Sequence, residues 1–90
     1  MTDGTLQPAF NYKNITASAS TQIKTIEGIL HTIVVNTSVA SAVVYDGISG
    51  SAAIATISSS VPICLVYDIQ FNNGLSVVTT AGCNITVGYV

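Results

Sequence analysis

The feature that most constrains the fold of this chain is a succession of short runs rich in Val, Ile and Thr, separated by turn residues. Such runs favour strands, because β-branched side chains pack well on a pleated surface. No segment keeps the 3.6-residue apolar period of an amphipathic helix, so we expect no long helix. The predicted strands are 14–19, 21–26, 29–37, 40–46, 52–58, 62–71, 75–80 and 83–90.

The spacing of these strands indicates the fold class. About eight strands, one every 8–11 residues, are typical of an antiparallel β-sandwich or barrel. Two connections carry clear turn signals, Asp46-Gly47 and the run Asn-Asn-Gly at 72–74. The length of 90 residues suffices for one domain. We therefore predict a single all-β domain.

The first 13 residues differ from the rest, because they show no period and contain a glycine and a proline. We predict an extended N-terminal arm over 1–13 and the β-domain over 14–90. Phe10 and Tyr12 lie two positions apart in this arm. Aromatic side chains are costly to leave in water, so we expect both to dock on a neighbouring molecule.

Alternation indicates which side of each strand is buried. The odd positions of 63–71 and of 83–90 form one apolar face, opposite a mixed face, as in antiparallel sheets. The segment 29–37 is apolar on both sides, with Ile29, Ile33 and Val35 on one and Leu30 and Val34 on the other. In so small a protein we expect the second side of this strand to lie in an interface.

Charge is almost absent. Charged residues make up 7% of the chain, against about 25% in an ordinary soluble domain. An uncharged exterior suits the core of a protein interface, which is depleted in charge. Two lysines and no arginine are too few cations to neutralise a run of phosphates, so we expect no nucleic-acid partner.

The sequence also bears on membranes and export. No stretch of 18 apolar residues is present, so we expect no membrane insertion. The N-terminus lacks the basic and apolar regions of a secretory signal. We therefore expect the protein to be made in a reducing cytosol.

Few residues are candidates for catalysis, metal binding or disulfide formation. His31 is the only histidine and has neither a nucleophile nor enough metal ligands near it in sequence. Cys64 and Cys83 lie in opposite phases of their strands, which favours free thiols. Asp46 and Asp68 each follow a Val-Tyr pair, and we interpret both as strand-end residues that cap a turn. We predict no catalytic residue, no metal site and no cofactor.

Three Asn-x-Ser/Thr sequons occur, at Asn14, Asn36 and Asn84. Because no secretory signal is evident, we interpret them as by-products of a sheet surface rich in Ser, Thr and Asn. A sugar site on a sandwich is a weaker alternative, since the chain has no Trp and only four Tyr as stacking platforms.

A family resemblance runs through five segments: 30–37 (LHTIVVNT), 43–47 (VVYDG), 54–57 (IATI), 67–79 (YDIQFNNGLSVVT) and 85–89 (ITVGY). In these segments the chain resembles small virion proteins encoded in the structural gene clusters of tailed phages. The resemblance implies a jelly-roll-like β-sandwich carried on phage particles. Capsid decoration or cement proteins of this kind are commonly trimers that sit between major capsid proteins.

The resulting hypothesis is a capsid decoration protein on the exterior of the virion, made in the host cytoplasm. Its expected partners are its own copies, as a homotrimer, and the major capsid protein. The expected interface residues are Phe10, Tyr12, Leu30, His31, Thr32 and Val34. The alternative is a head-fibre, tail or baseplate module that contacts a host glycan or receptor. An enzyme is a third hypothesis, which the scarcity of polar groups disfavours.

Overall fold

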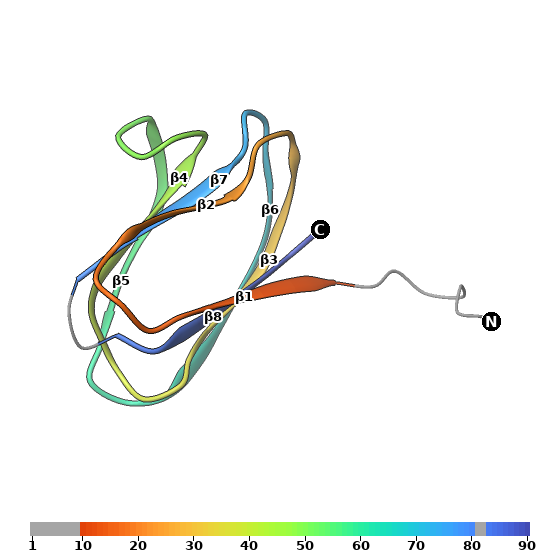
Figure 1. Cartoon of the computed structure of the whole chain (residues 1–90). Coiled ribbons are helices and arrows are strands. Elements are labelled where there is room, and N and C mark those ends of the chain that lie inside the picture. The colour runs from red at the N-terminus through yellow and green to blue at the C-terminus, as the bar shows by residue number, and fades with distance from the viewer. Residues whose placement is uncertain (1–9, 81–82) are drawn as a thin grey trace.

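A computed structural model describes residues 10–80 and 83–90 of the chain (Figure 1). This part forms eight strands and no helix, and it therefore contains no helical segment suited to crossing a membrane. The strands are β1 (Asn11–Ile15), β2 (Ser20–Lys24), β3 (Gly28–Val35), β4 (Val39–Asp46), β5 (Ala52–Ser59), β6 (Ile63–Phe71), β7 (Leu75–Thr79) and β8 (Ile85–Tyr89). The predicted number of strands is confirmed.

The strands form two antiparallel four-stranded sheets packed as a sandwich, with orders β1-β8-β3-β6 and β2-β7-β4-β5. Strand β1 pairs with β8, β2 with β7, β3 with β6, and β4 with β5. The chain therefore resembles one long hairpin that is wound around itself, which is the arrangement of a jelly roll. The predicted all-β, jelly-roll-like sandwich is confirmed.

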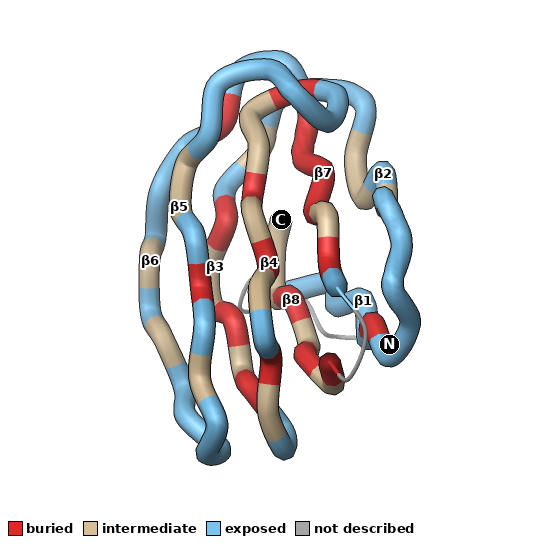
Figure 2. Tube along the Cα trace, turned by 90° about the vertical axis from the view of Figure 1, so that its left-hand side faces the viewer, coloured by how far each residue is buried: buried red, intermediate tan, exposed pale blue. Residues whose placement is uncertain are grey.

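The core lies between the two sheets, where red buried segments of β3, β4, β7 and β8 face one another (Figure 2). Both sheets contribute, because alternate residues of each strand point inward. The largest fully buried apolar side chains are Phe71, Leu30, Ile33, Leu75, Ile85, Val35, Val39, Val44, Val77 and Val87.

A β-bulge in β3 changes which residues of this strand are buried. Leu30 lies opposite Tyr89 of β8, but Thr32 lies opposite Gly88, so β3 carries one extra residue at His31. The extra residue reverses the alternation. Leu30 and Ile33 both point into the core, and Ile29 lies exposed. The predicted division of this strand into two faces is wrong for Leu30 and Ile29 for this reason.

The alternation predicted for β6 and β8 is confirmed. Phe71 of β6 and Ile85 and Val87 of β8 are buried, and Leu65 and Tyr67 pack partly against the core. The inward residues of β6 are less covered than those of β8, because β6 is an edge strand and β8 lies between two others.

The arm boundary also differs from the prediction. Residues 11–13 belong to β1, where Asn11 lies opposite Tyr89 and Lys13 opposite Val87. Pairing with the β-rich C-terminal segment orders residues whose own sequence shows no strand period. Residues 1–9 of the predicted arm lie outside the described residues.

Asp46 caps the turn between β6 and β7. Its carboxylate accepts hydrogen bonds from the backbone N–H of Asn72, at 3.0 and 3.1 Å, and of Asn73, at 2.8 Å. Gly74 completes the turn with a φ of 128°, a conformation that favours glycine. The turn-capping interpretation is confirmed for Asp46. It is wrong for Asp68, which lies inside β6 with a φ of 49°.

We expect the change Asp46→Ala to lower the free energy of unfolding by about 1–3 kcal/mol, because two backbone donors lose a charged acceptor. Asp46→Asn keeps one acceptor oxygen and should cost less. Urea denaturation with an unchanged slope would measure both losses. An Asp46→Ala protein as stable as the parent would contradict the capping role.

Candidate functional site

The most distinctive surface of the molecule is the solvent side of the β1-β8-β3-β6 sheet, which we call the outer face. Two rows of paired residues cross it from strand to strand. Tyr12, Gly88, Thr32 and Val66 form one row, and Asn14, Thr86, Val34 and Cys64 form the next. Phe10, Ile29, His31 and Asp68 complete the outer face.

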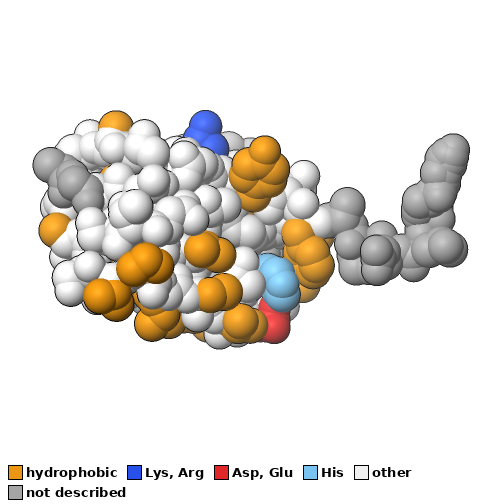
Figure 3. All heavy atoms as spheres, turned by 90° about the horizontal axis from the view of Figure 1, so that it is seen from below, with side chains coloured by type: hydrophobic (Ala, Val, Ile, Leu, Met, Phe, Trp, Pro, Cys, Tyr) orange, Lys and Arg blue, Asp and Glu red, His pale blue; other side chains and the backbone are white. Residues whose placement is uncertain are grey.

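Large apolar side chains are unusually exposed around this sheet (Figure 3). Tyr12 is 74% exposed and Val66 is 65% exposed, and both lie on the outer face. Of the nine exposed large hydrophobic residues in the described chain, four lie on the outer face, namely Phe10, Tyr12, Ile29 and Val66, and two, Ile63 and Ile69, lie on the inward side of its edge strand β6. The other three lie in loops. Clustered apolar exposure of this kind marks interaction surfaces.

Charge is nearly missing from the same surface. Of the charged residues in the described part of the chain, only Asp68 lies on the outer face. Lys13 shares the inward register of β1 with Val87, and Glu27 lies between β2 and β3. A partner that covers the outer face would therefore desolvate few charges, which removes the largest cost of burial.

The bulge in β3 positions one ordered side-chain cluster at the end of this face. The Nδ1 atom of His31 lies 2.5 Å from Oδ1 of Asp68, on the neighbouring strand. The ring of Phe10 stacks on the imidazole, with centroids 4.2 Å apart and an angle of 12° between the planes. The cluster fixes the start of β1 against β3, and it leaves Phe10 half exposed.

The three sequon asparagines converge at the opposite end of the face. The side-chain amide of Asn14 donates to Oδ1 of Asn84 (3.1 Å) and to Oγ1 of Thr86 (3.2 Å). The amide of Asn36 donates to the same two oxygens at 3.1 and 3.0 Å. Residues from three neighbouring segments are therefore joined by one hydrogen-bond network.

We expect Asn84→Ala to lower the free energy of unfolding by about 1 kcal/mol, because it removes an acceptor shared by two amides. Thermal or urea denaturation measures this loss. Asn11→Ala is a matched control, since Asn11 is exposed on the adjacent strand and should change stability by only a few tenths of a kcal/mol. Equal effects of the two changes would contradict a structural role for the network.

The structure brings five of the six predicted interface residues to one surface. Phe10, Tyr12, His31, Thr32 and Val34 all lie on the outer face. Leu30 does not, because the bulge turns it into the core, where it is 0% exposed.

Sequence reasoning missed other members of this surface. Val66 is one of them. The alternation of 63–71 predicts that Val66 lies on the mixed, outward side of its strand, but it does not by itself indicate an interface residue. Asp68 and the three asparagines come together only through strand pairing, and no local sequence signal announces those contacts.

The His, Cys, Asp and Glu side chains of the described residues are the groups that could bind a metal ion. No group of three His, Cys, Asp or Glu side chains comes together among them. Cys64 is exposed and Cys83 is buried, and both are free thiols, as predicted. The Sγ atom of Cys83 lies 3.5 Å from the carbonyl oxygen of Ala17 and helps to seal the corner between β1 and β2.

Comparison with known proteins found no match to a family model, to a curated protein or to a solved structure.

Proposed function

We propose that this protein is a structural subunit of a phage particle, a capsid decoration protein that stabilises the head by bridging major capsid proteins. The observation that carries the proposal is the outer face, which exposes large apolar side chains, is nearly uncharged and is built on a four-stranded sheet. The sequence resemblance to small tailed-phage virion proteins supplies the identity of the partner. The jelly-roll strand order is compatible with that class and supports it only at the level of fold.

The mechanism of such a subunit is passive. The outer face packs on a neighbouring protein, and Tyr12 and Val66 supply the largest exposed apolar area. Identical subunits, as homotrimers, repeat these contacts on the capsid exterior. Weak contacts multiplied by symmetry then resist outward pressure, because linked sites gain avidity without new contacts.

A second function is favoured by one specific observation, the amide network beside Tyr12. Asn14, Asn84 and Thr86 hold hydrogen-bonding groups in fixed positions, two residues along β1 from an exposed aromatic ring. Amides next to an aromatic platform suit a neutral sugar. This arrangement supports a head-fibre, tail or baseplate module that contacts a host glycan.

Co-sedimentation separates the two proposals. Purified protein is mixed with heads of the encoding phage from which it has been stripped, and bound protein is quantified in the pellet. Saturable binding at hundreds of copies per head supports decoration. Failure to pellet with heads, together with retention on a neutral glycan array, supports the host-binding function and overturns decoration.

A further inference from the structure

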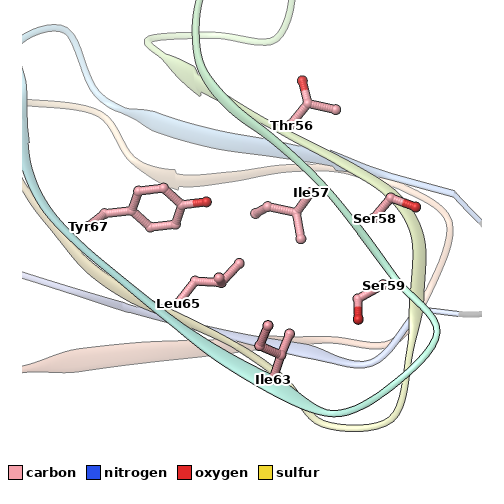
Figure 4. Close-up of a pocket in the computed structure, with 7 residues that line it drawn as sticks. All are labelled: Thr56, Ile57, Ser58, Ser59, Ile63, Leu65 and Tyr67. Atoms are coloured by element: carbon pink, nitrogen blue, oxygen red, sulfur yellow. The ribbon is translucent and has the colours of Figure 1, made fainter.

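An apolar groove runs along the side of the sandwich between β5 and β6, with a volume of about 290 Å³ (Figure 4). Ile63, Leu65 and Tyr67 of β6 point into it, and Ile57 and Ser59 of β5 face them. These positions belong to the inward side of their strands, yet Ile63 is 43% exposed. The groove is therefore a part of the space between the two sheets in which core-facing side chains remain exposed to solvent.

At the opposite side of the sandwich, where β1 and β2 are the edge strands, the space between the sheets is covered. There the chain crosses from β1 to β2 and is bonded to the second sheet, with Oγ1 of Thr79 donating to the carbonyl of Ala17 at 2.7 Å. Ile15 and Cys83 are buried beneath this corner. On the β5–β6 side most of β6 and half of β5 are exposed (Figure 2).

Both strands that border the groove are edges of their sheets. Strand β6 ends one sheet and β5 ends the other, so each presents a row of backbone N–H and C=O groups with no neighbouring strand. Edge strands beside an apolar groove accept an added extended segment, which gains backbone hydrogen bonds and buries alternate side chains.

We propose that the groove receives residues 4–8 of a second copy of this chain. This segment, Gly-Thr-Leu-Gln-Pro, carries no charge, which matches a groove lined only by apolar and hydroxyl side chains. In an extended segment Leu6 points away from Thr5 and Gln7, so Leu6 enters the groove and the two polar residues face water. Pro8 ends the added strand because it has no N–H.

The length of the N-terminal segment fits this occupant. From Ile63 to Tyr67 the groove wall covers about 13 Å, at about 3.3 Å per residue. Leu6 lies four residues before Phe10, so it reaches about 13 Å from Phe10 when the chain is extended. Residues 4–8 cover the same length when extended, and Ala9 alone joins them to Phe10, so Phe10 of the donor subunit lies beside one end of the groove.

A second copy is favoured over the chain's own segment because of where Phe10 lies. Phe10 is held on His31, on the outer face, whereas the groove opens between the sheets. Phe10 precedes β1, which lies at the opposite edge of the sheet from β6, so the chain's own segment would cross three strand spacings, about 14 Å, before it turned toward the other sheet. The three residues between Leu6 and Phe10 are too few for that path, so Leu6 of the same chain does not reach the groove. A donor subunit placed beside the groove has no such detour.

Insertion of one copy into the next is a head-to-tail contact, which closes into a ring when the rotation permits. The inference goes beyond the proposed function, because it concerns contacts between copies of this chain and holds without any capsid. It assigns the groove to self-assembly and leaves the outer face to the partner.

Variants with one exposed cysteine test the proposal in the full chain, with Cys64→Ser removing the natural exposed thiol and Cys83 remaining buried in the fold. One protein carries Leu6→Cys and a second carries Ile63→Cys. The two are refolded together and oxidised, and intact mass identifies the products. We expect a disulfide-linked heterodimer at least tenfold above that formed with Ile48→Cys, an exposed loop position outside the groove.

Three further results complete the test. Leu6→Asp in the parent chain should reduce the oligomer measured by light scattering while the circular dichroism spectrum stays unchanged. A heterodimer yield no higher than that of the Ile48→Cys control would overturn the proposal. So would an internal disulfide in monomers of a chain carrying both Leu6→Cys and Ile63→Cys. Head binding plays no part in these measurements, so the proposed function stands or fails separately.

Discussion

Replacement of Leu30 by alanine is expected to lower the free energy of unfolding by about 2–5 kcal/mol, the range for emptying a fully buried leucine site. Leu30 is 0% exposed and sits beside the bulge, where neighbouring strands restrict any collapse around the cavity. A domain of this size has a thin stability margin, so this loss consumes much of it.

Urea denaturation of Leu30→Ala and Ile29→Ala provides the comparison. Ile29 precedes Leu30 and is exposed, so its truncation should change stability by about 0.5 kcal/mol or less. A larger loss for Ile29→Ala than for Leu30→Ala would indicate that Ile29 is buried and Leu30 is exposed, as regular alternation of β3 predicts. That outcome contradicts the bulge.

Replacement of Val66 by aspartate is expected to weaken binding to heads about a hundredfold or more while leaving the fold intact. Val66 is 65% exposed in the free domain, so a carboxylate there stays hydrated. In a covered outer face the same carboxylate is buried without a cation, at a cost of several kcal/mol. Each 1.4 kcal/mol corresponds to about tenfold in affinity.

Ile48→Asp is the matched control, because Ile48 is 71% exposed in the loop between β4 and β5, away from the outer face. Titration of both labelled variants onto stripped heads measures the two affinities. Equal affinities for Val66→Asp and the parent protein would remove the outer face from the head interface.

Much of the fold follows from local sequence. Runs of Val, Ile and Thr predicted the positions of β2 to β8, and only the last two residues of β1. Asp46-Gly47 correctly indicated the turn after β4, although the carboxylate of Asp46 caps the distant turn between β6 and β7. The alternation of β6 and β8 predicted their buried sides, because both strands keep the period of two although the register shifts where they pair with β3.

Other features depend on contacts between distant segments. A bulge is created by pairing, so no pattern within 29–37 shows that His31 is the extra residue. The link between His31 and Asp68 and the meeting of the sequon asparagines likewise require the strand order. The scarcity of charge and the aromatic residues Phe10 and Tyr12 therefore predicted that an interaction surface exists, but the sequence did not predict all of the residues that form it.

A density map of the intact phage particle tests the central claim most directly. The account predicts many copies of this jelly roll on the head exterior, with the β1-β8-β3-β6 sheet against a neighbouring protein and Tyr12 and Val66 covered. A particle without the chain, or copies whose outer face points to solvent, would contradict it.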